Sequence, residues 1–511
     1  MIEYPADTIT ELLARGAGSA QAVGAPGRPW LTHDGLRALV ARTVADLNRM
    51  GIGRGDRVAI VLPNGPEMAA SFLAIGAGAT TAPLNPAYRT EEFEFYLADL
   101  NAKALVIAEG MESPSRAVGT ARGIPIVDLV PEAGGPAGAF TLVAPAGLSG
   151  TPARSGPAEA EDVALVLHTS GTTSRPKIVP LRHINVTASA YHIGATLRLT
   201  ADDVCLNIMP LFHIHGLIAA TLSSLAAGGS VFCTTGFNAF RFFTWFEEAR
   251  PTWYTAVPTM HQAILGLAGR HPDAIKASRL RFIRSSSSSL PPQVMEALEQ
   301  SFGVPVIESY GMTEAAHQMA SNPLPPGERY PGSVGIAAGP EIAIMDEAGR
   351  LLPTGELGEV VIRGRDVTAG YENNPEANAK AFTNGWFRTG DQGVLDERGY
   401  LRLTGRLKEL INRGGEKISP IEVDVVLMDH PAVAQCVTFA MPHKMLGEEV
   451  AAAIVLAEGT SARDHELRAF AAERLAPFKV PRKFIFLDEI PKGATGKLQR
   501  IGLAEKLGIT A

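Results

Sequence analysis

At 511 residues and 54.0 kDa, the chain exceeds the size at which one hydrophobic core keeps growing, so more than one domain is expected. Hydrophobic residues make up 46% and charged residues 19% of the sequence, which excludes a disordered or fibrous chain. The 46 basic and 53 acidic residues give a net charge of -7, which argues against a broad basic surface for nucleic acid.

The first part of the chain alternates short apolar runs with amphipathic segments. Residues 57–62 and 104–107 are typical of buried strands, and residues 91–100 of an amphipathic helix, which together predict an α/β fold. A stretch rich in Pro, Gly and Ala at residues 131–157 interrupts this pattern. It is interpreted either as the connection between two α/β halves or as a loop within one domain.

A smaller β-rich layer is predicted where short strand-like pieces with frequent turns begin, at residues 359–364 and 399–403. The pattern then resets to helices and strands, expected at residues 420–428, 433–441, 449–456 and 463–475.

The predicted fold class is therefore α/β. We expect a large N-terminal domain at residues 1–406, made of two α/β halves plus the β-rich layer. A small, mobile α+β domain is expected at residues 407–511.

Three well-separated cysteines lack the spacing of a zinc site or a disulfide framework, so reduced thiols are expected. The longest apolar stretch, residues 217–232, contains serine and glycine and is too short to span a bilayer. Neither a secretory signal nor the peroxisomal Ser-Lys-Leu type of address is found. We therefore expect a cytoplasmic protein without a membrane span; its oligomeric state is left open.

A loop rich in hydroxyl groups follows the apolar strand expected at residues 163–167. Residues 168–177 read His-Thr-Ser-Gly-Thr-Thr-Ser-Arg-Pro-Lys, which places two cations and free backbone N–H groups at a strand end. Such a loop suits an anion, and the Walker pattern of P-loop enzymes is absent. The segment is interpreted as a phosphate-binding loop, and a polar surface turn is the alternative.

Four further motifs follow in order along the chain. Residues 308–314 offer an aromatic ring, a hydroxyl and a carboxylate, which suit adenine and Mg²⁺. Residues 386–391 end in an aspartate suited to ribose hydroxyls, and residues 405–418 and 491–500 are rich in glycine and lysine. Each motif alone is explained by a turn, but five motifs in one order favour a function.

Together these motifs resemble the signature set of the adenylate-forming superfamily, which includes acyl-CoA synthetases, luciferases and peptide-synthetase adenylation domains. The resemblance covers nearly the whole chain. Residues 252–259, 281–285 and 409–420 resemble oxalate-CoA ligases of plants and fungi more narrowly. The resemblance implies an ATP-dependent ligase that converts a small carboxylic acid to an acyl-adenylate and then to a CoA thioester.

The resemblance also implies roles for individual residues. Lys497, Glu314 and Thr172 are expected to be catalytic, the last two by holding Mg²⁺. A fixed ammonium and a metal suit this chemistry, because attack of a carboxylate on an α-phosphate brings two anions together. Contacts to ATP and AMP are expected from Thr169, Ser170, Gly171, Thr172, Thr173, Lys177, Tyr310, Gly311, Thr313, Asp391 and Arg406.

The small domain is expected to turn about Lys408 between the two half-reactions. Gly414 and Gly415 match the loop that lines the CoA tunnel in the second conformation. Glycine suits that position, because a residue without a Cβ lets a thin thiol arm pass close to the backbone.

One position departs from the family pattern. Ile178 stands where the family usually has glycine after the loop lysine, and isoleucine does not adopt a positive φ cheaply. The far end of the loop is therefore expected to have a different shape, which puts nucleotide affinity in doubt.

A polar acid site is predicted from His213, Ser289 and His317, which supply donors for a second carboxylate that cannot be buried unpaired. The resemblance to oxalate-CoA ligases extends to the positions of His317 and Ser289, which favours oxalate or another short dicarboxylate. The alternative for His213 is a gate residue common to CoA ligases, and for His215 a core histidine is favoured.

Three functions stay open. The favoured one is the acid-CoA ligase, for oxalate or for another small or medium-chain acid. The second is an adenylate-forming enzyme that transfers its acyl group to a carrier-protein thiol or to oxygen. The third, a catalytically silent relative, is disfavoured because Lys497, Glu314 and Asp391 are all present.

Overall fold

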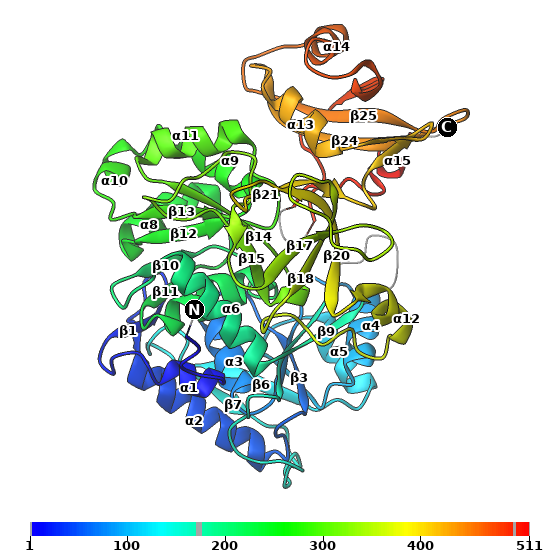
Figure 1. Ribbon diagram of the computed structural model, residues 1–511. Helices are drawn as coiled ribbons and strands as arrows, with labels where there is room; N and C mark the ends of the chain where they lie inside the picture. The colour runs from blue at the N-terminus through cyan, green and yellow to red at the C-terminus, as the bar shows by residue number, and fades with distance from the viewer. Residues whose placement is uncertain (1–2, 170–175, 494–496, 510–511) are drawn as a thin grey trace.

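A computed structural model describes residues 3–169, 176–493 and 497–509 of the chain (Figure 1). Its first half is a seven-stranded sheet, parallel except for its two edge strands β7 and β9. The strand order is β7 (Phe140–Val143), β6 (Ile126–Pro131), β5 (Ala104–Ala108), β3 (Arg57–Val61), β4 (Thr80–Pro83), β8 (Val163–His168) and β9 (Ile178–Arg182). Its helices are α1 (Ile9–Leu13), α2 (His33–Arg49), α3 (Pro66–Gly76), α4 (Thr90–Leu100) and α5 (Pro114–Ala121).

The second half is a nine-stranded sheet that takes its far edge from the start of the chain. The order is β16 (Ile336–Ala337), β15 (His317–Ser321), β14 (Val306–Met312), β13 (Phe282–Ser285), β12 (Trp253–Ala256), β10 (Val204–Asn207), β11 (Ser230–Cys233), β1 (Gln21–Gly24) and β2 (Leu31–Thr32). The helical segments are α6 (His183–Thr196), the π-helix η1 (His215–Leu222), α7 (Ser223–Ala226), α8 (Ala239–Ala249), α9 (Pro258–Ala268), α10 (Pro272–Lys276), α11 (Pro292–Phe302) and the 3₁₀ turn η2 (Thr313–Ala315).

An antiparallel five-stranded sheet forms the predicted β-rich layer. It contains β17 (Glu341–Met345), β18 (Gly358–Arg363), β19 (Phe382–Thr383), β20 (Trp386–Leu395) and β21 (Leu401–Arg406), with α12 (Pro375–Ala381) beside it. One hydrophobic cluster joins this layer to both large sheets, with buried contributions from Val360 of β18, Val58 of β3 and Phe282 of β13. These three sheets therefore share one core.

The C-terminal unit, drawn in orange and red at the top of Figure 1, has its own core. Its sheet joins β22 (Ile411–Arg413), β23 (Glu416–Ile418), β24 (Val433–His443), β25 (Gly447–Leu456) and β26 (Lys483–Phe486). Its helices are α13 (Pro420–Met428), α14 (Asp464–Ala472), the 3₁₀ turn η3 (Pro477–Lys479) and α15 (Leu503–Lys506). The two clusters that fill this unit consist only of residues after position 410. The α/β class with a small α+β part is thus confirmed, and the boundary at residue 406 stays a prediction.

The stretch at residues 131–157 is a loop within the first half. It contains β7, and β8 and β9 complete the same sheet after it. After β1 and β2, which belong to the second sheet, the chain returns to that sheet only after Arg182, through α6 to β10. Of the two interpretations of this stretch, the loop is therefore the one that the sheet order supports.

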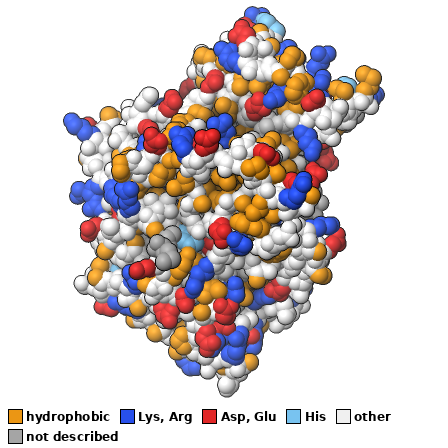
Figure 2. Space-filling model, viewed as in Figure 1, with side chains coloured by type: hydrophobic (Ala, Val, Ile, Leu, Met, Phe, Trp, Pro, Cys, Tyr) orange, Lys and Arg blue, Asp and Glu red, His pale blue; other side chains and the backbone are white. Residues whose placement is uncertain are grey.

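The surface agrees with the charge balance. On the face drawn in Figure 2, basic and acidic side chains are interspersed rather than gathered into a basic patch. Among the described helices, none combines the length and apolarity needed to cross a membrane.

Candidate active site

The adenine and ribose motifs meet between β14 and β20. The hydroxyl of Tyr310, near the end of β14, donates to a carboxylate oxygen of Asp391, and Arg406 Nε lies 3.4 Å from the other oxygen. The tyrosine and the aspartate are buried, whereas the arginine side chain is 58% exposed. Burial raises the pKa of Asp391, and Arg406 opposes this shift. The three side chains thus lie together as the motifs predicted, and their contact with a nucleotide stays a prediction.

Gly311 is required by close packing of the backbone. A Cβ on this residue would lie 1.8 Å from the carbonyl oxygen of His317, on the antiparallel neighbour β15. Thr313 begins the turn η2 that separates these two strands.

Glu314 lies in the same turn and is buried. It accepts a hydrogen bond of 2.8 Å from the hydroxyl of Tyr371, and its pKa is raised by burial. Lys177 Nζ lies 4.1 Å from the centre of the Tyr371 ring. The phosphate-loop lysine and the predicted metal-binding carboxylate are therefore brought together around one tyrosine, which the sequence motifs did not include.

The hairpin of β8 and β9 closes the base of the predicted phosphate loop. The backbone N–H of Thr169 donates to the carbonyl of Lys177 at 3.0 Å, and the Lys177 N–H donates to the Thr169 hydroxyl at 3.3 Å. The predicted residues Ser170, Gly171, Thr172 and Thr173 lie outside the described part of the chain.

Ile178 is a strand residue at the end of this loop. It pairs with His168 and is buried in the core at 5% exposure. Its φ is not positive, so the backbone here does not need the glycine that the family pattern prefers. The expected cost of isoleucine at this position is therefore absent, and the side chain packs in the core instead.

Lys497 reaches this site from the C-terminal unit. Arg406 and Asp391 both act on its charge: burial and repulsion by Arg406 lower the pKa of Lys497 to about 8, and Asp391 opposes the shift. The backbone of its loop is closed by a 2.8 Å hydrogen bond from the Gly493 N–H to the Lys497 carbonyl. In this conformation Lys497 thus lies close to the predicted ribose-binding residues Asp391 and Arg406.

A cluster of histidines lies beside Lys497, in which His215 and His317 are buried and His213 is half-buried. The rings of His215 and His317 meet edge to face, with centroids 5.0 Å apart. His213 accepts from the N–H of His215 at 3.3 Å. Burial, with repulsion by Lys497, lowers the pKa of His213 to about 3, and burial also moves the pKa of His317 well below its usual range. At neutral pH these rings are uncharged and can each donate one N–H.

Two of the predicted acid-site residues, His317 on β15 and Ser289 in the serine tract, differ in their burial. His317 is buried at 1%, has φ of 114° and leaves Nδ1 without a hydrogen-bond partner within the described structure. Ser289 is exposed, whereas Ser287 contacts Nδ1 of His215 at 3.0 Å. The other nitrogen of His215 contacts the hydroxyl of Thr255 at 2.6 Å. His215 is thus a satisfied core histidine, and within the tract Ser287 is the serine that lines the cluster.

The predicted CoA glycines form the turn of the β22–β23 hairpin. Gly414 and Gly415 have φ of 59° and 100°, and the N–H of Gly414 donates to Leu446 at 2.9 Å. A two-residue hairpin turn of this kind favours glycine for conformational reasons alone. Lys408, the predicted hinge, is exposed between β21 and β22.

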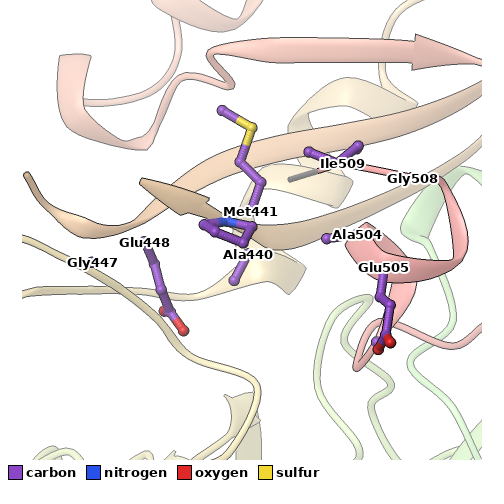
Figure 3. Close-up of a pocket in the computed structure, with 10 residues that line it drawn as sticks. Ala440, Met441, Gly447, Glu448, Ala504, Glu505, Gly508 and Ile509 are labelled. Carbon is purple, nitrogen blue, oxygen red and sulfur yellow. The ribbon is translucent and has the colours of Figure 1, made fainter. Parts of the chain in front are cut away.

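A separate cavity of about 580 Å³ lies in the C-terminal unit, between the β24–β25 hairpin and α15 (Figure 3). Met441, Glu448 and Glu505 are among the residues that line it. None of the predicted site residues that the structure describes lines this cavity, so it is not the site assembled above.

Two family models match the chain. The model described as AMP-binding enzyme matches residues 13–372, and the model described as AMP-binding enzyme C-terminal domain matches residues 422–497. An oxalate-CoA ligase of Arabidopsis thaliana is 46% identical over 97% of this chain and 97% of its own length. An oxalate-CoA ligase of Saccharomyces cerevisiae is 44% identical over 88% and 87%.

A solved structure shares the whole architecture. ATP-bound MatB from Rhodopseudomonas palustris superimposes with a TM-score of 0.87 at 29% identity, covering 98% of both chains. The apo form of the same protein gives a TM-score of 0.77 over the same share. The arrangement of this chain is therefore nearer to that of the ATP-bound relative.

Proposed function

Because the chain belongs to the AMP-binding enzyme family, we propose that it is an ATP-dependent ligase that joins oxalate to CoA through an oxalyl-adenylate. The observation that carries this proposal is the neutral histidine cluster beside Lys497, which offers N–H donors to a small, doubly charged acid. The two oxalate-CoA ligases at 46% and 44% identity support the choice of acid.

The nucleotide side of the site fits ATP and Mg²⁺. Mg²⁺ in such sites is held by one or two carboxylates together with substrate phosphates, and Glu314 supplies a buried carboxylate next to Lys177. Glu314 and the hydroxyl of Thr172 would hold the ion, which when bound draws negative charge from the phosphate oxygens. Tyr310 offers a face to adenine, and Asp391 and Arg406 offer hydrogen bonds to the ribose.

Lys497 acts where the two anions meet. Its ammonium stabilises the negative charge that develops as the acid attacks the α-phosphate and pyrophosphate leaves. In the second half-reaction the CoA thiol displaces AMP from the oxalyl group, forming the thioester and releasing AMP. We propose that the C-terminal unit turns about Lys408 between these steps, bringing Gly414 and Gly415 to the thiol path.

A panel of acids tests the proposal. We expect oxalate, or failing that another very short dicarboxylate, to give the highest kcat/KM for pyrophosphate release. Discrimination against apolar acids should be on the order of 10⁴-fold, because they leave buried donors unpaired. A preference for hexanoate or longer acids would contradict the proposal.

The same panel identifies the acyl acceptor. With ATP and the acid present, the thioester should form when CoA is the only acceptor. An enzyme that turns over only with an added carrier protein would instead be an adenylate-forming enzyme that transfers its acyl group to a carrier-protein thiol. The cytoplasmic location also stays a prediction, which fluorescence microscopy of the tagged chain can check.

A further inference from the structure

Arg284 is an unusual arginine because it lies in the core. It stands on β13, between β12 and β14 in the nine-stranded sheet, and its exposed fraction is 0%. Arginine is almost never fully buried unless a carboxylate or another anion pairs with it.

The guanidinium group has no such partner among the described residues. Among the described residues it donates to two neutral oxygens over long distances, 3.5 Å to Thr255 Oγ1 and 3.3 Å to Gln318 Oε1. Its Nε is buried without a hydrogen-bond partner in the described structure. Burial lowers the pKa of Arg284 to about 9, so the group stays charged at neutral pH. A charge in this position carries a large desolvation cost that the protein itself does not offset.

The charge lies against the predicted acid site. The hydroxyl of Thr255, which accepts from Arg284, also contacts Nε2 of His215. The charge of Arg284 also acts on the titration of both His215 and His317. The unpartnered Nδ1 of His317 lies in the same cluster. An uncompensated cation, Arg284, and an unpartnered ring nitrogen, Nδ1 of His317, thus converge where a small anion is expected.

We propose that Arg284 is the counter-charge for the second carboxylate of oxalate, the one that is not adenylated, and so determines specificity for a dianion. This inference rests on the proposed function. A neutral distal group cannot compensate the buried guanidinium, whereas a carboxylate can accept charge-assisted hydrogen bonds from it and from His317. The alternative, that Arg284 serves only the packing of β13, predicts no dependence on the charge of the acid.

Oxamate tests this distinction, because it replaces the distal carboxylate of oxalate by a neutral amide of nearly the same shape. We expect the wild-type enzyme to prefer oxalate, measured as the ratio of kcat/KM for the two acids in pyrophosphate release. In Arg284→Gln, kcat/KM for oxalate should fall on the order of 10²-fold, while that for oxamate changes little, so the ratio collapses. KM for ATP should stay within about twofold of the wild type, because Arg284 faces the acid.

Two further variants make the result decisive. Arg279→Gln, the same change at an exposed position of the preceding loop, should leave the ratio intact. Arg284→Lys keeps a cation but loses the planar fork, and should lower kcat/KM for oxalate about tenfold. If circular dichroism shows that Arg284→Gln is unfolded, the Lys variant tests the role of Arg284 instead. If a folded Gln variant keeps the oxalate-to-oxamate ratio, or if the Lys variant keeps full oxalate activity, the role of Arg284 is wrong while the proposed function stands. A wild-type enzyme that does not use oxalate overturns the proposed function as well.

Discussion

His317 combines three features that a purely structural histidine seldom shares. It is buried, it adopts a φ that favours glycine, and one ring nitrogen has no partner in the described structure. A strained non-glycine backbone costs on the order of 1 to 3 kcal/mol, and such residues cluster at functional sites. The strain therefore supports a role in binding the acid.

We predict that His317→Ala damages the use of oxalate more than the use of ATP. The loss in kcat/KM for oxalate should be about 2 to 4 kcal/mol, because a charge-assisted hydrogen bond goes with the ring. Steady-state kinetics with each substrate varied in turn will measure it. His317→Gly is the matched control: it loses the same ring but accepts φ of 114° without strain. If ATP affinity alone falls, or if both variants are unfolded, His317 is not an acid-site residue.

Lys497 should give the adenylation step a pH dependence. Its ammonium is needed to stabilise the developing charge, and its pKa of about 8 means that the proton is lost as pH rises through that value. Single-turnover pyrophosphate release should therefore decline above about pH 8. Lys497→Ala should nearly abolish this step at every pH, yet still convert a supplied acyl-adenylate and CoA to thioester. Equal loss of both steps would show that Lys497 is structural.

At this scale the sequence assigns roles to residues in the nucleotide motifs, and it assigns none to Tyr371 or to Arg284, although residues 281–285 carry a family resemblance. Tyr310, Asp391 and Lys497 stand in recognisable segments, and the structure brings them to one place. Arg284 and Tyr371 are single side chains whose importance depends on what surrounds them. Only burial without a counter-charge, in the first case, and contact with Glu314, in the second, single them out.

At the scale of elements, the β14–β15 hairpin depends on one glycine. We predict that Gly311→Ala displaces His317, because the new Cβ would lie 1.8 Å from its carbonyl oxygen. Oxalate activity should be lost, and the free energy of unfolding should fall by about 1 to 3 kcal/mol, the cost of overpacking. Chemical denaturation and the acid assay measure the two effects.

Gly266 provides the control for this substitution. It lies on α9, is exposed, and a Cβ there would meet nothing within 4 Å. Gly266→Ala should stabilise the protein by up to about 1 kcal/mol through helix propensity and keep full activity. Equal stability of the two variants would mean that the hairpin tolerates a Cβ at position 311.

The helix at residues 420–428 shows why some elements are predictable. Ser419 caps α13 through a hydrogen bond from the Glu422 N–H, and Pro420 occupies the first turn, so local chemistry alone sets its start. By contrast, the end of the first sheet was not predictable from residues 131–157. Strand β8 pairs with β4, and β9 pairs with β8, through contacts that no local pattern reveals.

At the scale of the whole molecule, few polar contacts tie the C-terminal unit to the second sheet's helices. Among the described residues, Gln262 of α9 donates to Ala434 at 3.3 Å, and Gln293 of α11 donates to Asp429 of the α13 end. The two parts also have separate hydrophobic cores. This arrangement suits a rigid-body turn.

We predict that Lys408→Pro keeps adenylation and blocks thioester formation. Proline fixes φ at the proposed hinge, and no backbone hydrogen bond from the Lys408 N–H is lost among the described residues. The present arrangement, with Lys497 beside Asp391, supports the first half-reaction, so freezing it should spare that step. Lys408→Ala, which leaves φ free, should perform both steps. A proline variant that makes thioester at the wild-type single-turnover rate would place the hinge elsewhere.

The position of β1 has a consequence for biosynthesis. Val23 of β1 pairs with Val231 of β11, which the ribosome makes about 10 to 40 s later at roughly 5 to 20 residues per second. During that interval Ala22 and Val23, fully covered in the finished protein, have no strand to pair with on this side. The N-terminal edge of the second sheet therefore cannot pair with the rest of that sheet until β11 has emerged from the ribosome.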